Sequence, residues 1–248
     1  MVNKQTNKRT TMNYKTLTAI ATAALLASAA NAEWHYGIGS GIGSASYDGD
    51  VEFGAGKLDV DYDSSDMESA FGGSAFATNG TWVFNLSGSA VEYESKDTIK
   101  NSGLTRTKNK FEQSGGEFTV GYVFYREDDI TITPFAGIRV TEHEWTISGD
   151  GPKLNDDANW TDGIFGVKVD YAINDEWTWN NSASYAGGDS EGCTAFQTGV
   201  SWKFAENWVT GAFVKFVHDE FEETNFSGEK YTYDTDVTTF GISIAYVW

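Results

Sequence analysis

The chain has 248 residues, of which 36 are acidic and 17 basic, and its formal net charge is −19 at pH 7. This excess of negative charge excludes nucleic acid as a partner, because phosphate binding needs the opposite sign. A single cysteine, Cys193, cannot form an internal disulfide and is expected to be a small packed side chain. Only two prolines, against 27 glycines and 15% aromatic residues, exclude a proline-rich or disordered chain.

The first 32 residues have the organisation of a secretory signal peptide. Basic residues without any acidic residue occupy positions 1–16, and a weakly apolar run extends from Leu17 to Ala27. Ala30-Asn31-Ala32 then forms a small-x-small pattern that fits cleavage before Glu33. An apolar run this short is a poor membrane span, which needs roughly 20 residues.

We therefore expect residues 1–32 to be removed on export and residues 33–248 to form one domain. That domain would hold 13 basic and 36 acidic residues, a net charge of −23, because the signal carries four basic side chains. Met12 opens a complete signal of its own, so the chain has two alternative start sites, Met1 and Met12.

The rest of the chain alternates large apolar residues with small or polar ones at a period of two, the pattern of β-strands. The last strand is the clearest, with Phe240, Ile242, Ile244, Tyr246 and Trp248 on one face. In chain order, the expected strands cover 34–46, 67–78, 82–90, 117–125, 130–140, 164–171, 177–185, 196–204, 208–218 and 239–248. The count is about ten, with eight as the alternative.

The connections between these strands alternate in length. Short ones are expected at 79–80, 127–129, 174–176 and 205–207. Longer ones are expected at 48–66, 96–113, 147–160, 187–192 and 219–236. Tight periplasmic turns and long extracellular loops are typical of transmembrane barrels. The predicted fold class is all-β, an antiparallel up-and-down transmembrane β-barrel.

A soluble sandwich or a lipocalin-like barrel is the main structural alternative, since alternation alone does not say which face meets water. A solvated outer face would be rich in Lys, Glu and Gln, whereas the polar face here is mostly Gly, Ala, Ser and Thr. Trp and Tyr also gather near strand ends, where an interfacial girdle would lie. Both features favour the membrane barrel.

The signal ending in ANA and the final segment FGISIAYVW resemble the small Gram-negative outer-membrane β-barrel proteins, the OmpA-like and OmpW-like group. The resemblance implies a location in the outer membrane, among lipid and lipopolysaccharide. It also implies that assembly machinery reads the closing strand, from Phe240 to Trp248. Members usually end in Phe, and this chain ends in Trp248. No binding or catalytic residue is carried over, and no cofactor is expected.

The interior of a ten-stranded barrel is narrow, because open aqueous channels belong to barrels of 16 to 18 strands. Charged residues expected to line the lumen are Glu117, Arg139, Lys168, Asp170 and Lys215. Buried charges need partners, so one interpretation is a network of ion pairs that plugs the barrel. The other is a narrow, porin-like pore for ions or small solutes.

The expected long loops carry most of the charge, acidic in 48–66 and 219–236 and basic in 96–113. Four interpretations of these charged loops are open. The loops form a solvated rim, they pair with one another, the acidic ones bind divalent cations, or the basic one contacts lipopolysaccharide phosphates. Asp59-x-Asp61-x-Asp63 begins like a calcium loop, and these three residues are the weak metal candidates. Ser64 stands where that motif needs Gly, and Ala70 where it needs a bidentate Glu.

Two histidines near the expected extracellular strand ends raise the question of catalysis. His143 is flanked by Glu142 and Glu144, and His218 is followed by Asp219. Surface proteases of the omptin kind use Asp/His pairs at that height, and such a pair could activate water as a general base. This chain is shorter and lacks a matching motif. The prediction is a non-enzymatic barrel acting in membrane integrity or surface interaction, with the narrow pore and the omptin-like hydrolase as alternatives.

Overall fold

The computed structural model describes residues 33–53, 56–95, 99–101, 104–149, 153–224 and 230–248. The expected signal peptide lies outside the described residues. No helix in the described ranges is long and apolar enough to cross a membrane.

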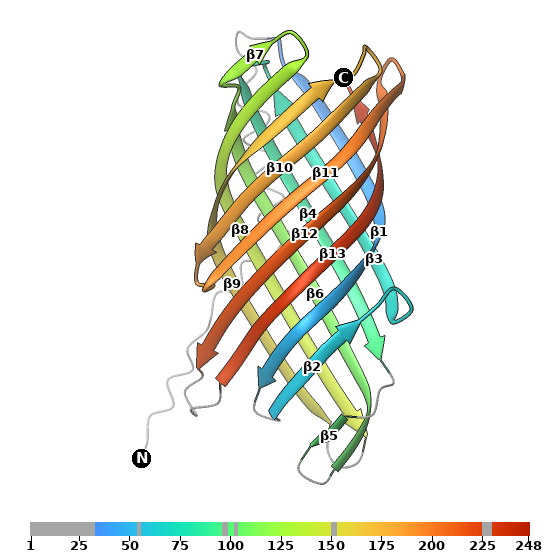
Figure 1. The fold of residues 1–248 in the computed structure, drawn as a ribbon, viewed down its shortest axis with the longest axis vertical. Coiled ribbons are helices and arrows are strands. Elements are labelled where there is room, and N and C mark those ends of the chain that lie inside the picture. The colour runs from blue at the N-terminus through green and yellow to red at the C-terminus, as the bar shows by residue number, and fades with distance from the viewer. Residues whose placement is uncertain (1–32, 54–55, 96–98, 102–103, 150–152, 225–229) are drawn as a thin grey trace, which may run out of the picture. The chain divides into compact units, whose positions relative to one another are not determined.

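Ten long strands and three short ones make up the described chain (Figure 1). The long strands are β1 (His35–Phe53), β3 (Met67–Thr78), β4 (Trp82–Ser95), β6 (Leu104–Tyr122), β8 (Ile130–Gly149), β9 (Leu154–Ala172), β10 (Trp177–Gly188), β11 (Gly192–Ala205), β12 (Trp208–Thr224) and β13 (Lys230–Val247). The short strands are β2 (Gly56–Tyr62), β5 (Ile99–Asn101) and β7 (Tyr125–Glu127).

The ten long strands close into one antiparallel barrel, which confirms the predicted fold class and count. Each pairs with its neighbours in chain order, and β6 pairs directly with β8. The last strand closes on the first, in a register that runs from Gly37 opposite Val247 to Glu52 opposite Thr232. At the end of this seam, Tyr36 and Trp248 exchange two backbone hydrogen bonds of 2.8 and 2.9 Å. A closed barrel leaves no unpaired sheet edge.

The four short turns lie where the sequence predicts them, at the barrel end that also holds Trp34 and Trp248. Two of them are fixed by an asparagine whose side-chain oxygen accepts backbone N–H groups. Asn79 accepts from Trp82 at 2.8 Å, and Asn174 accepts from Trp177 at 2.9 Å. Gly80 has a φ of 80°, a conformation that glycine adopts without steric cost. We call the half of the barrel next to these turns the terminal half, and the other the distal half.

The prediction of long loops is wrong for most of the residues it covered. Much of 48–66 lies in β1 and β2, and most of 96–113 lies in β5 and β6. Similarly, the ranges 147–160 and 219–236 are largely the distal parts of β8, β9, β12 and β13, and between β10 and β11 the turn is only 189–191. The strands therefore extend well past the apolar segments that marked them in the sequence.

The reason is a reversal of polarity along each strand, which β13 shows most simply. In the terminal half its outward residues, such as Phe240 and Ile242, are apolar and about 60% exposed, and its inward residues are small. In the distal half, Tyr231 and Tyr233 face inward and are buried, whereas Asp234 and Asp236 face outward and are exposed. The alternation keeps its period of two, but the apolar residues move from the outer face in the terminal half to the inner face in the distal half.

The terminal half has the outer surface of a membrane-spanning barrel. Its apolar side chains form an exposed band, and paired aromatic rings lie at the strand ends beside the turns, including Trp82 with Tyr122 and Trp208 with Tyr246, each pair 5.1 Å apart. Its inner surface is rich in glycine, and large neighbours fill the room that this leaves. Phe76 packs over Gly37, where an added Cβ would lie 2.2 Å from the ring.

The distal half is filled by aromatic side chains. We call these nine residues the aromatic plug: Tyr47, Tyr62, Tyr93, Phe111, Trp145, Trp160, Phe221, Tyr231 and Tyr233. They come from eight strands around the barrel, and every one is at most 7% exposed. Stacked rings, such as Phe111 on Trp145 at 4.2 Å and Trp160 on Phe221 at 4.3 Å, fill the barrel interior at this level.

Candidate functional site

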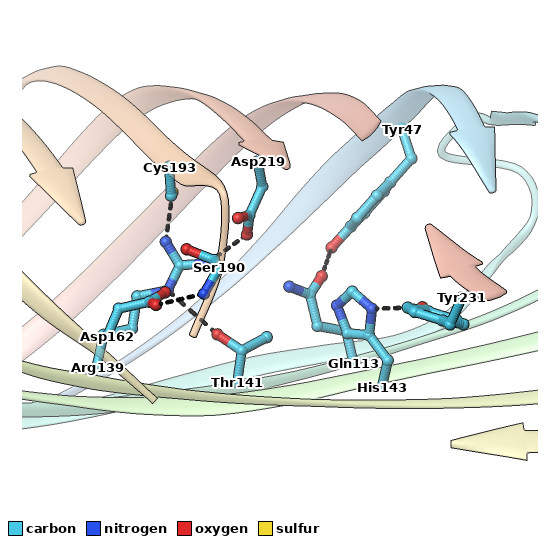
Figure 2. Close-up of polar contacts among 10 residues, drawn as sticks. All are labelled: Tyr47, Gln113, Arg139, Thr141, His143, Asp162, Ser190, Cys193, Asp219 and Tyr231. Atoms are coloured by element: carbon cyan, nitrogen blue, oxygen red, sulfur yellow. Dashed lines mark hydrogen bonds and ion pairs between the residues drawn. The ribbon is translucent and has the colours of Figure 1, made fainter. Parts of the chain in front are cut away.

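A polar cluster inside the barrel lies next to the aromatic plug (Figure 2). Arg139 reaches from β8 across the lumen and forms an ion pair with Asp219 of β12, and it also contacts the thiol of Cys193 on β11. Its Nε donates to the hydroxyl of Thr141 at 3.1 Å. Because Arg139 is 12% exposed and Asp219 only 2%, this pair links opposite parts of the wall away from solvent.

A second carboxylate adds to the negative charge of this cluster. Asp162 of β9 faces inward beside Arg139 and accepts the backbone N–H of Ser190 at 3.0 Å. Among the described residues, four buried oxygens here have no hydrogen-bond partner: Asp162 Oδ2, Ser190 Oγ, Asp219 Oδ1 and Thr235 Oγ1. Arg139 is the counter-charge of the buried Asp219, with the second buried carboxylate beside it in register, so its loss would be costly.

His143 is enclosed by the aromatic plug. Its Nδ1 lies 3.1 Å from the hydroxyl of Tyr231, which also accepts a hydrogen bond from Trp145. The rings of Phe111, Trp160 and Tyr233 pack edge-on against the imidazole at 4.5 to 5.0 Å. His143 lies in the distal half, beyond the exposed band of apolar side chains. Burial is the larger cause that lowers the pKa of His143 well below its ordinary value, and the positive charge of Arg139 is the smaller one.

We expect acidification to destabilise the barrel through His143. A depressed pKa in the folded state means that the unfolded chain binds the proton first, so this contribution to stability is complete above about pH 6.5 and declines as the pH falls below it. Unfolding midpoints in urea, measured between pH 7.5 and 5, should fall for the wild type. A His143→Phe variant, which keeps an aromatic ring in the site, should show a flatter profile. Parallel profiles for the two proteins would contradict this assignment.

The five predicted lumen residues all lie on the inner face, but they do not form a single cluster. Arg139 belongs to the polar cluster, and Glu117 lies opposite it on β6. Nearer the turns, Lys168 and Asp170 form an ion pair of 3.0 Å along β9. Lys215 faces inward from β12, opposite Gln197 and Thr239.

The candidate catalytic pairs are separated by strand alternation. His143 points inward, whereas Glu142 and Glu144 are exposed on the outer face. His218 points outward, whereas Asp219 points inward to Arg139. Adjacent residues of a strand face opposite sides, so neither histidine meets its sequence neighbour. The partners that the structure shows for His218 are Glu220 and Asp236.

The calcium-like segment runs from a strand into a turn. Asp61 lies in strand β2, and the side chain of Asp59 is outside the described residues. Asp63 follows in a tight turn, where its carboxylate accepts the backbone N–H of Ser65 at 2.6 Å. Hydrogen bonding from Ser65, first from its side chain and then from its backbone N–H, lowers the pKa of Asp63. The metal assignment of these three residues stays a prediction.

Outward carboxylates of three neighbouring strands form a second polar feature, which we call the acidic wall. It comprises Asp48, Asp50, Glu52, Glu220, Glu222, Asp234 and Asp236. Register places Asp48 opposite Asp236 and Asp50 opposite Asp234, so like charges face each other across the seam between β1 and β13. Such pairs are destabilising unless a counter-charge lies between them.

Sequence reasoning missed the aromatic plug and the inward role of Asp219. A signal for both was present in the segments taken as loops. In 219–223 and 231–237 the alternation continues, with aromatic and other buried residues on one face and carboxylates on the other. Searching for alternation of either polarity would have extended the strands and identified the buried face.

No protein-family model matches the sequence, and no curated protein matches it. Solved structures of outer-membrane proteins align with most of the chain. The outer membrane protease OmpT from Escherichia coli aligns over 87% of this chain and 96% of its own, with a TM-score of 0.53 and 7% identity. Ail, the attachment invasion locus protein of Yersinia pestis, aligns over 87% and 99%, with a TM-score of 0.36 and 14% identity. The Neisserial surface protein NspA aligns over 86% and 96%, with a TM-score of 0.36 and 11% identity. The likeness to OmpT, together with the closed antiparallel barrel, shows that the chain has the fold of outer-membrane β-barrel proteins.

Proposed function

We propose that the chain is a non-enzymatic outer-membrane protein that acts in membrane integrity or surface interaction. The observation that carries this proposal is the division of the barrel into two halves. The terminal half offers its exposed band of apolar side chains to lipid. The distal half has a lumen filled by the aromatic plug and a charged outer surface. In the proposed orientation, the short turns lie in the periplasm and the acidic wall faces the cell exterior.

The two alternative functions receive less support. A narrow channel needs a continuous aqueous path, whereas the aromatic plug fills the distal lumen with side chains that are at most 7% exposed. A hydrolase needs an accessible base paired with a carboxylate. His143 is buried in the aromatic plug, and His218 points outward whereas Asp219, its predicted partner, points inward to Arg139.

The proposed partners follow from the same two surfaces. Outer-membrane lipid, including lipopolysaccharide, would contact the apolar belt and the base of the acidic wall, with divalent cations bridging carboxylates to lipid phosphates. Before insertion, assembly machinery would read the closing strand. The residues of that signal, from Phe240 to Trp248 on alternate positions, all lie exposed on the outer face of the barrel.

Deletion of the gene tests the proposed role in cells. We expect the deletion strain to be more sensitive to detergent than its parent, and the wild-type gene to restore resistance. A version with Asp48, Asp50, Asp234 and Asp236 changed to asparagine should restore it poorly. The matched control neutralises four acidic side chains of the short turns, Asp128, Asp129, Asp175 and Glu206, and should complement fully. Equal resistance of the parent and deletion strains would refute a role in membrane integrity.

A further inference from the structure

We propose that the acidic wall contains a metal site for a borderline-soft divalent cation such as Zn²⁺, formed by His218, Glu220 and Asp234. This inference goes beyond the proposed function and does not depend on it. Its starting point is geometric. One ligand atom from each of the three side chains lies within 4.8 Å of those of the other two.

Strand geometry explains why the three side chains converge. His218 and Glu220 are two residues apart on the outer face of β12, so they point the same way. Asp234 lies directly opposite Glu220 on β13, and Asp236 lies directly opposite His218. Cross-strand neighbours have Cβ atoms about 4.5–5.5 Å apart, so these four side chains form a compact square. Long paired strands on both sides hold this arrangement in place.

The hydrogen bonds of the imidazole prepare it for a metal. Its Nδ1 lies 3.0 Å from Asp236 Oδ1, and its Nε2 lies 2.8 Å from Glu220 Oε1. In metal sites, a ligating histidine usually donates its other ring N–H to a carboxylate, which fixes the tautomer and orients the ring. Asp236 is placed for that positioning role. Nε2 would then be the ligand, beside oxygens from Glu220 and Asp234.

The ligand types select the class of cation. Zn²⁺ is bound by imidazole nitrogen together with carboxylate oxygen, commonly with three protein ligands and one open position. Ca²⁺ and Mg²⁺ prefer oxygen alone. The histidine therefore separates this site from the carboxylates of the surrounding wall. A bound cation would also offset the repulsion between Asp48 and Asp236, which face each other across the seam.

Titration calorimetry with ZnCl₂ on the purified, folded full barrel, without a polyhistidine tag, tests the site. We expect the wild type to bind one Zn²⁺ per chain. His218→Ala should reduce the affinity for Zn²⁺ at least about 10-fold, because it removes a ligand. Asp236→Asn should reduce it about 10-fold, because the imidazole ring loses the carboxylate that orients it. The matched controls are His35→Ala, an exposed histidine at the start of β1, and Glu144→Gln, an exposed carboxylate of the distal β8. Both should bind Zn²⁺ like the wild type.

Two results would overturn the proposal. One is equal Zn²⁺ binding by the wild type and His218→Ala. The other is a response to CaCl₂ as strong as that to ZnCl₂, which would indicate an acidic surface without selective ligands. Heat-modified migration in detergent gels confirms that each variant is folded before titration, since a closed barrel opens slowly.

Discussion

Replacing Trp160 by alanine is expected to lower the free energy of unfolding by about 3–5 kcal/mol, the usual cost of deleting a buried tryptophan. The side chain is 2% exposed and stacks on Phe221 at 4.3 Å, with His143 packed edge-on at 4.6 Å. Its removal leaves a cavity that rings held on separate strands cannot readily fill. Urea unfolding of the protein in lipid vesicles measures the change.

A Trp160→Phe variant provides the matched comparison. It keeps an aromatic ring against Phe221, so the loss should be clearly smaller than for alanine. If Trp160→Ala unfolds at the same urea concentration as the wild type, the aromatic plug does not contribute to stability in the way its burial implies.

Replacing Arg139 by methionine is expected to destabilise the barrel by about 3–5 kcal/mol, because it removes one partner of a buried ion pair. Methionine keeps much of the side-chain volume, so the loss reports charge more than packing. Asp219 is 2% exposed and would lose its ion-pair partner, and a second buried carboxylate, Asp162, lies beside Arg139 in register. The same unfolding assay in vesicles applies.

A double-mutant cycle separates the ion pair from general disruption. Combining Arg139→Met with Asp219→Asn removes one of the stranded charges, so the double variant should be more stable than Arg139→Met alone. The expected coupling energy is about 0.5–3 kcal/mol. Strictly additive losses would show that the two side chains do not interact, contrary to their contact across the lumen.

The terminal half could be predicted from the sequence because its alternating pattern indicates a strand with an apolar outer face. Large apolar residues alternate with small ones, as in Phe240 to Trp248, and tight turns such as Asn79-Gly80 mark the strand ends. Closure of the barrel between the first and last strands also followed from this pattern. In the membrane, every backbone group must be paired, and only a closed barrel does this with strands.

The distal half could not be predicted in the same way, because the alternating pattern was interpreted with apolar residues on the outer face throughout. Beyond the belt, the outer face meets water and the inner face must form a core, so Tyr231 and Tyr233 point inward and Asp234 and Asp236 outward. The many charged residues of 219–236 therefore led to the prediction of a loop there. The pairings of Arg139 with Asp219, and of His218 with Asp236, join residues on different strands and depend on register, which local patterns do not specify.

Single-channel recording in planar lipid bilayers tests whether the aromatic plug closes the barrel. Folded wild-type protein, confirmed by heat-modified migration, should insert and remain electrically silent, while a porin recorded under the same conditions conducts. Discrete, reproducible conductance steps from the wild-type protein would show that the lumen is open, because they require an aqueous path where the nine rings of the aromatic plug are packed.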